Sequence, residues 1–300
     1  MRTILLALAL AACTPPKVGD SAPIQDTAPS PVGGIIAATS GAAAIEAGRV
    51  VLDEGGTAMD AALTVAMSQI VLTVGSWNSY AGIMGMVVYD AETGELSSLH
   101  GNYGTFAGET DPMSIPESEP SGRTAMVGGF MAAAQAAHQA HGVLPWERLF
   151  EPAIGLAEDG FEVDVYLDYY IETRQDVLSR RDETWAVFTD ADGQPWEQGD
   201  TITQPALAQT LRAVADQGAA YMYTGAWADH FVRAVSEEGG AVSAADLAAG
   251  FPGFRGIRRR QELRGVVGGI AVLDDFAHHP TAVRVTLDAL AMLFAGRRLW

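Results

Sequence analysis

Pairs and runs of histidine and arginine are the residues of this chain whose spacing could form a binding site. His138 and His141 lie three positions apart on an expected helix, which is half of a metal site. With no third ligand in view, a solvated helix face is the favoured interpretation. His278 and His279 are neighbours on an expected turn, where adjacent side chains diverge. A structural role, or a contact to the edge of a nucleotide, is therefore favoured over metal binding. The run Arg258–Arg260 indicates a charged strand or turn more than a nucleic-acid patch.

The composition excludes several kinds of site. The formal net charge is −19, from 18 basic and 37 acidic residues, and such a field repels nucleic acid. The single cysteine, Cys13, excludes an intramolecular disulfide and a thiolate zinc cluster. The only lysine, Lys17, lies near the N-terminus, so the folded part holds neither a phosphate-loop lysine nor a Schiff-base lysine. We expect no metal and no cofactor.

The N-terminal residues predict a membrane-anchored precursor. Arg2 precedes an apolar stretch, Ile4–Ala12, which is too short for a transmembrane helix and is typical of a signal peptide. Leu10–Cys13 resembles the bacterial lipobox, in which the cysteine is acylated. We therefore expect residues 1–12 to be a lipoprotein signal peptide, Cys13 to carry lipid, and residues 13–32, with their prolines, to be a disordered tether. The expected location is the cell envelope, on its periplasmic or extracellular face. An ordinary signal sequence with an incidental cysteine is the alternative.

The body of the chain, residues 33–250, is predicted to alternate helices with a few strands. A helix ends before Gly55, and Thr57 caps the next, with Asp60 favouring its N-terminal dipole. Two strands joined by the turn Asp90–Gly94 are expected to pair. The other predicted elements are strands Met84–Tyr89 and Glu95–His100, helices Gly128–Ala140, Trp146–Glu158, Pro205–Gln217 and Ala226–Glu238, and a short helix after Ser243.

Many short motifs in this body, in one collinear order, resemble the large subunit of gamma-glutamyltranspeptidases. They are Gly34–Ala38, Ala43–Gly48, Leu52–Ala62, Gly142–Ile154, Leu156–Phe161, Gly199–Asp200, Gln204–Ala208, Tyr223–Gly225 and Asp246–Ala249. The resemblance implies an N-terminal-nucleophile hydrolase with a four-layer αββα sandwich, an α+β fold of which this chain would be the large-subunit half. It also implies transfer or hydrolysis of a γ-glutamyl group from a small peptide or amino acid, typically glutathione.

The resemblance also implies what the chain lacks. In the family the nucleophile is the N-terminal threonine of a small subunit, whose α-amine is its base. We therefore expect no catalytic residue in this chain, and activity only with a partner that supplies the threonine. An arginine that binds the donor's α-carboxylate follows the second strand in the family, and Asn102 stands at that position here. A neutral amide cannot form the bidentate charged pair of a guanidinium.

The last fifty residues differ in composition and in resemblance. Residues 251–300 carry a net charge of +4, against −23 for the first 250. They are similar to the opening of a Mur-type ligase C-terminal domain, the type that joins murein tripeptide to UDP-N-acetylmuramate, with a strand over Ile270–Leu273 and a helix over Thr281–Phe294. This resemblance implies a partial α/β segment in which Asp275 and His278 contribute to a nucleotide site.

Two alternatives to an enzyme part remain open at this point. One is a non-catalytic envelope lipoprotein that binds a small peptide or amino acid. The other is a truncated or fused reading frame that carries part of an ATP-dependent ligase. The ligase activity itself is not expected, because no G-x-x-x-x-G-K-[ST] motif occurs in the chain.

Overall fold

The computed structural model describes residues 4–7, 36–38, 41–94, 96–115, 121–250, 262–267 and 270–274, together with Arg284 and Leu287. The chain divides into two units, Met1–Phe254 and Arg255–Trp300. Cys13, Asp275 and His278, for which the sequence predicts lipid attachment and nucleotide contacts, lie outside the described residues.

The first two helices of the larger unit, α1 (Ala42–Asp53) and α2 (Ala58–Leu72), pack against each other. The predicted cap is confirmed as a full capping box, in which the Thr57 hydroxyl accepts from the Asp60 N–H and the Asp60 carboxylate accepts from the Thr57 N–H. Helix α2 is buried on nearly all sides, as its apolar sequence predicts.

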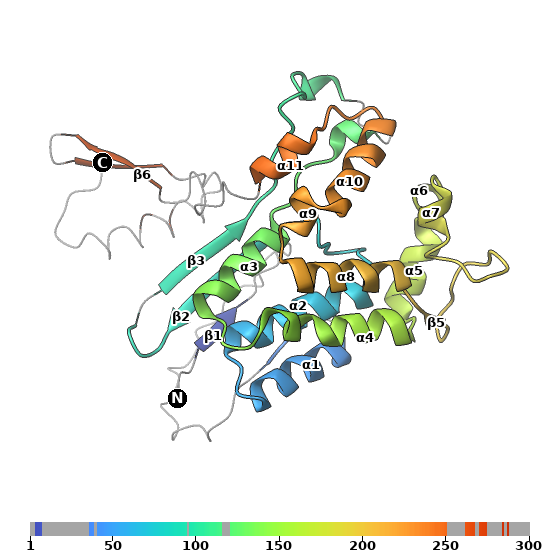
Figure 1. Ribbon diagram of the computed structural model, residues 1–300, viewed down its shortest axis with the longest axis horizontal. Coiled ribbons are helices and arrows are strands. Elements are labelled where there is room, and N and C mark those ends of the chain that lie inside the picture. Colours follow the sequence, from blue (N-terminus) through green and yellow to red (C-terminus); the bar gives the residue numbers. More distant parts are fainter. Residues whose placement is uncertain are drawn as a thin grey trace. The chain divides into compact units, whose positions relative to one another are not determined.

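The sheet of this unit has the antiparallel order β1-β2-β3, with β1 (Ile4–Ala7), β2 (Met84–Asp90) and β3 (Leu96–Gly101). Residues of β2 alternate between a buried face, on which α2 and α3 (Phe130–His141) pack, and an exposed face (Figure 1). The predicted hairpin is confirmed, with Tyr89 opposite Leu96 in register. Strand β1 lies within the expected signal peptide, whose removal is a question of processing and stays a prediction.

The helices behind the sheet form the main core, and here one expectation is wrong. The single helix predicted over Trp146–Glu158 is a 3-10 turn, η3 (Trp146–Phe150), followed by α4 (Glu151–Asp159). Pro152 has no N–H to donate, so it suits the first turn of α4 better than the middle of a longer helix. Helix α8 (Pro205–Gln217) has the predicted bounds, and the Trp146 indole donates to Val214 O at 3.1 Å, tying η3 to α8.

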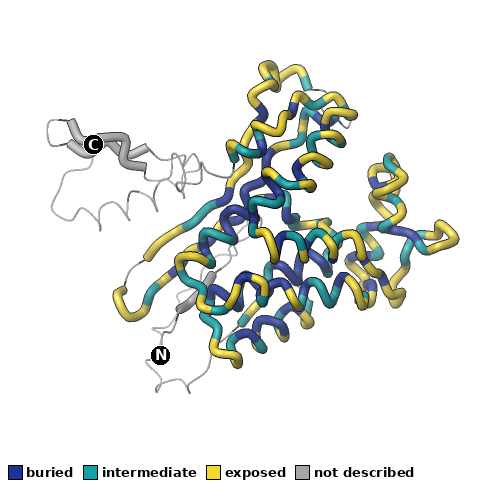
Figure 2. Tube along the Cα trace, in the orientation of Figure 1, coloured by how far each residue is buried: buried dark blue, intermediate teal, exposed yellow. Residues whose placement is uncertain are grey.

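A side module over residues 161–202 has its own small core. It contains β4 (Phe161–Glu162), α5 (Val165–Thr173), α6 (Gln175–Leu178), α7 (Asp182–Trp185) and β5 (Thr201–Ile202). The buried residues are Val163, Leu167, Ile171, Leu178, Phe188 and Ile202. Figure 2 shows that many residues of this module are exposed.

The larger unit is completed by η1 (Pro112–Ser114), η2 (Gly122–Thr124), α9 (Tyr221–Thr224), α10 (Ala226–Glu237) and α11 (Ala244–Gly250). Ser243 and Asp246 form the capping box predicted for the last helix. Among the described residues, none of the helices combines the length and apolarity needed to cross a membrane.

The architecture agrees with half of the expected sandwich. In the described residues one three-stranded sheet has helices on one face, and a second central sheet facing it is not present. In the smaller unit, β6 (Glu262–Val267) and β7 (Ile270–Asp274) form an antiparallel hairpin. The strand predicted over Ile270–Leu273 is confirmed, and Arg284 and Leu287, within the predicted helix, are helical.

Candidate functional site

A close backbone contact positions the residues around Asn102. Gly101, the last residue of β3, and Asn102 after it lie against Gly129, just before α3, and a Cβ on Gly129 would lie 2.6 Å from Asn102 O. A Cβ on Gly128 would collide with the backbone of Ala81 and Gly82, and the Phe130 N–H donates to Gly82 O at 3.0 Å. Only glycine allows this approach of three chain segments.

Asn102 lies exposed at the end of β3, on this contact. The sequence predicts it as a substrate contact, and its accessible position leaves its amide free to meet a ligand. Because the amide carries one acceptor and two donors without a charge, it can hydrogen-bond a carboxylate only as a neutral partner.

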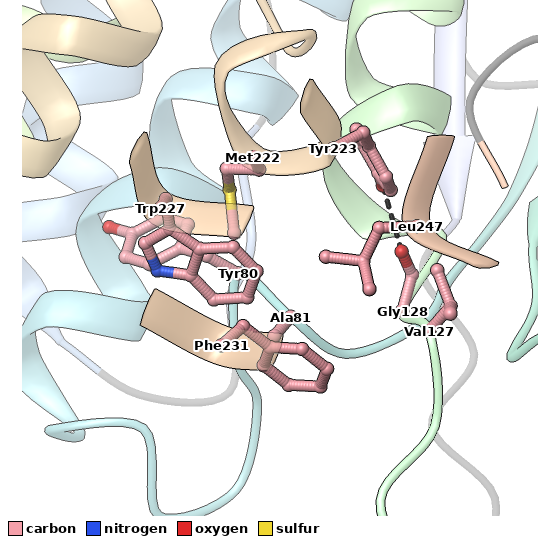
Figure 3. A pocket seen from close by; sticks show the side chains of 9 residues that line it. All are labelled: Tyr80, Ala81, Val127, Gly128, Met222, Tyr223, Trp227, Phe231 and Leu247. Carbon is pink, nitrogen blue, oxygen red and sulfur yellow. Dashed lines mark hydrogen bonds between the residues drawn. The ribbon is translucent and has the colours of Figure 1, made fainter. Parts of the chain in front are cut away.

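A small, open hollow of about 10 Å³, room for about one water molecule, is lined in part by Gly128 (Figure 3). Its walls come from the segment before β2, the segment before α3, and α9, α10 and α11. Trp227 and Phe231 stack at 5.2 Å between ring centroids and form one aromatic wall. The lining residues are Tyr80, Ala81, Val127, Gly128, Met222, Tyr223, Trp227, Phe231 and Leu247.

The two tyrosine hydroxyls of the hollow are bound to the backbone. Tyr80 Oη donates to Met67 O at 2.6 Å, and Tyr223 Oη donates to Gly128 O at 2.8 Å and accepts from the Ala132 N–H. Burial raises the pKa of Tyr80 well above its usual value, and burial raises that of Tyr223 to about 12, partly offset by the Ala132 N–H. Both remain protonated at neutral pH, so neither is a general base or a nucleophile.

The hollow is lined almost wholly by apolar surface, and it supplies no acid, base or nucleophile. No group of three or more histidine, cysteine or acidic residues able to hold a metal occurs in the described part of the chain. The aromatic wall was not expected from the sequence, although Trp227 and Phe231 are four positions apart and so lie on one face of α10.

The expectation of a solvated helix face is wrong for His138. Its side chain is only 15% exposed, lies against Trp146, and Nε2 is 2.7 Å from Leu144 O. Because a carbonyl oxygen only accepts, Nε2 carries the proton. His138 thus links the end of α3 to the loop before η3, a contact beyond the helix that helical periodicity does not reveal.

A partly buried ion pair that the sequence did not reveal lies in the loop between β3 and α3. Arg123 Nε and Nη2 donate to Glu109 at 2.7 and 2.8 Å, and Nη2 also donates to Asp111 O and Ser114 Oγ. The Arg123 hydrogen bonds hold the pKa of Glu109 to about 2. Nε and Nη2 of Arg123 are thus committed to partners within this loop.

The similarity to known proteins lies in the same body of the chain. The sequence profile described as Gamma-glutamyltranspeptidase matches residues 44–251. The chain is 33% identical over 218 residues to Glutathione hydrolase 3 of Arabidopsis thaliana, covering 71% of this chain and 34% of that protein. It is 29% identical over 255 residues to the Glutathione hydrolase proenzyme of Escherichia coli, covering 80% and 43%. Scoloptoxin SSD14 of Scolopendra dehaani is 30% identical over 210 residues, covering 67% and 36%. The chain thus spans between 34% and 43% of the length of these curated relatives.

Solved structures show the same fold. The crystal structure of Helicobacter pylori gamma-glutamyltranspeptidase aligns with a TM-score of 0.71 at 23% identity, over 90% of this chain and 79% of that chain. The transpeptidase CapD of Bacillus anthracis aligns with a TM-score of 0.60 at 26% identity, over 81% and 76%. Together with the profile match, which covers most of the described body, these findings show that the chain belongs to the gamma-glutamyltranspeptidase family.

Proposed function

We propose that this chain is the large-subunit part of an enzyme that transfers or hydrolyses the γ-glutamyl group of small peptides, as a glutathione hydrolase does. The observation that carries the proposal is the match of residues 44–251 to the family profile. Relatives named glutathione hydrolase align with the same body.

The reactive threonine is proposed to lie in polypeptide outside residues 44–251. Its hydroxyl attacks the γ-carbonyl carbon while its α-amine takes the hydroxyl proton. The α-ammonium then gives this proton to the donor nitrogen, the carbon–nitrogen bond breaks, and the glutamyl group remains as an ester on the threonine. Water or an acceptor amine then releases the glutamyl group. This division of labour agrees with a hollow whose tyrosine hydroxyls are held by Met67 O and Gly128 O.

The exposed face of the sheet supports a partner carrying the threonine. Val87 and Tyr89 on β2 are each 42% exposed, and Leu96 on β3 is 69% exposed. The register places Tyr89 and Leu96 opposite each other and so on one face. Apolar side chains of a half-covered sheet are buried when a second sheet packs on them. We propose that the partner covers this face.

Asn102 is proposed to contact the donor's α-carboxylate. Its position at the exposed end of β3 supports this role. Since its amide is neutral, we expect weaker selection for a free α-carboxylate than a guanidinium would give.

The test is a γ-glutamyl anilide assay on the chain alone and on its complex with a threonine-leading small subunit. We expect no release of the anilide from the chain alone and release from the complex. The control is a complex whose leading threonine is replaced by alanine, which should be inactive. A properly assembled complex that remains inactive with the native threonine would contradict the proposal.

The lipid anchor on Cys13 and the envelope location are separate proposals, supported by the sequence Leu10–Cys13. Mass spectrometry of the mature N-terminus should find acylated Cys13. An unmodified peptide that begins elsewhere would contradict both the anchor and the membrane as a partner.

The nucleotide-site roles of Asp275 and His278 are also proposals, supported by the sequence resemblance of residues 251–300 alone, since the family profile ends at residue 251. The basic composition of residues 251–300 supports an origin different from that of the body. Resequencing of the locus tests this difference in origin. A continuous transpeptidase reading frame through residue 251 would contradict a separate origin.

A further inference from the structure

An unpartnered aromatic face on the side module calls for an explanation beyond γ-glutamyl chemistry. Trp77 is 75% exposed, Tyr166 73%, Tyr169 65% and Val165 53%. One side of α5 carries Val165, Tyr166, Tyr169 and Tyr170. The centroid of the Tyr170 ring lies 6.4 Å from that of Trp77. We call these five residues the aromatic face; the α5 region that carries most of them is marked in Figure 1.

Of these five residues, only Tyr170 packs against the core of the side module. Helix α5 already buries Leu167 and Ile171 in the module's core, on its opposite side. Single exposed hydrophobic residues are common, but a contiguous exposed group marks an interaction site in soluble proteins. Tyrosine and tryptophan supply large contact area with little loss of side-chain freedom.

The turn that presents Trp77 is held in an unfavourable backbone conformation. Val74 has φ +48°, which a β-branched residue rarely adopts, and Gly75 follows with φ +73°. Thr73 Oγ1 donates to Asn78 Oδ1 at 2.9 Å and so spans the turn. The Val74 side chain packs against the module's core, while Trp77 points to solvent.

The rim of the aromatic face is acidic. Asp168 and Glu172 lie along the side of α5 next to Val165 and Tyr169. Neither forms an ion pair with a described cation, whereas Glu54, Glu109 and Glu158 elsewhere in the unit are each paired with an arginine. Residues 162–176 contain five carboxylates and one arginine. The rim therefore keeps an uncompensated negative field.

We propose that the aromatic face and its rim bind a cationic peptide segment, rich in arginine or lysine. Guanidinium and ammonium groups are attracted to the faces of tryptophan and tyrosine, and their aliphatic stems cover apolar surface. The rim carboxylates steer and pair with the same cations.

Two other occupants fit the face less well. An apolar partner would bury the aromatic rings but leave Asp168 and Glu172 at the edge of a dry contact without a counter-charge. A second copy packed face to face would bring each rim against its own like charges, in a chain of net charge −19.

The experiment measures fluorescence anisotropy of a labelled octa-arginine peptide with the full chain, at rising salt. An octaglutamate peptide and a neutral, leucine-rich peptide of equal length are the comparison probes. We expect saturable binding of octa-arginine that weakens with salt, and neither comparison probe should bind as tightly. The double variant Tyr166→Ser/Tyr169→Ser should raise its Kd about tenfold. The double variant Asp168→Asn/Glu172→Gln should weaken binding about fivefold and flatten the salt dependence.

Matched controls separate this site from general attraction to an acidic protein. Asp216→Asn/Asp229→Asn removes the same charge from exposed positions on α8 and α10, and Met113→Ser/Val143→Ser removes exposed apolar area elsewhere. Both should bind octa-arginine as the native chain does, and circular dichroism should show all variants folded. Lack of saturable binding, equal weakening in the controls, or tighter binding of the neutral peptide would each overturn the proposal.

Discussion

At the scale of single residues, Asn102 is the position with the most direct consequence for substrate choice. In the active complex, Asn102→Arg should lower KM for a γ-glutamyl anilide with a free α-carboxylate by about tenfold, because a charge-assisted bidentate pair adds about 1.5–3 kcal/mol. The analogue whose α-carboxyl is amidated should show no such gain. Steady-state kinetics with both substrates measures the difference.

The matched control for this prediction is Asn102→Gln, which keeps a neutral amide and should leave the preference between the two substrates unchanged. Equal improvement for both substrates in Asn102→Arg would mean that the side chain does not meet the α-carboxylate.

Glu109 should make the stability of the chain depend on acid. Its pKa is held to about 2 by the hydrogen bonds from Arg123, whereas an unfolded glutamate has a pKa of about 4.3. A carboxyl with a lowered pKa stabilises the fold above its unfolded pKa, and this stabilisation is lost as the pH falls from about 4.3 toward 2. Urea unfolding of the native chain and Glu109→Gln should differ at neutral pH and converge in acid. A difference that does not change with pH would assign the effect to packing.

At the scale of elements, the start of α2 depends on a buried carboxylate. Asp60 is fully buried, and its Oδ2 accepts from the Thr57 N–H at 2.8 Å and the Val143 N–H at 3.0 Å. Thr57→Ala should lower the free energy of unfolding by about 1–2 kcal/mol through loss of the cap. Asp60→Ala should cost about 3 kcal/mol, because it leaves buried N–H groups without acceptors.

The comparison for these variants is Ser243→Ala, which removes an exposed cap of α11 and should cost about 0.5–1 kcal/mol by the same denaturation measurement. If Asp60→Ala costs no more than Ser243→Ala, the link from α2 to the loop after α3 contributes nothing.

The elements that sequence predicts well are those with local signals. Thr57 with Asp60, the turn Asp90–Gly94 and Pro205 each announce a boundary, and the observed α2, β2–β3 hairpin and α8 follow them. The side module was not predicted, because α6 and α7 have four residues each and no apolar period can be read over so short a length.

The candidate site was only partly within reach of the sequence. Asn102 could be named because the family resemblance supplies its place after a strand. The hollow joins Tyr80, Gly128 and Trp227, which are far apart in the chain, and the glycine contacts near it follow from tertiary packing. His138 was misjudged for the same reason, since its partner Leu144 lies beyond the helix.

At the scale of the whole molecule, the open sheet face should decide whether the chain can assemble with a partner. Val87→Glu/Tyr89→Glu puts two charges on side chains that are exposed in the chain alone, so its thermal unfolding should change little. A second sheet packed on this face would bury both charges without counter-ions. The affinity of the two subunits should therefore fall at least tenfold, equivalent to about 1.4 kcal/mol. Turnover of the γ-glutamyl anilide should fall with it. Sedimentation of the mixed subunits measures assembly. Val143→Glu, at a site 64% exposed outside the sheet, is the control and should assemble normally. Normal assembly of the double variant would place the partner on another surface, because a packed second sheet cannot accept two unpaired carboxylates.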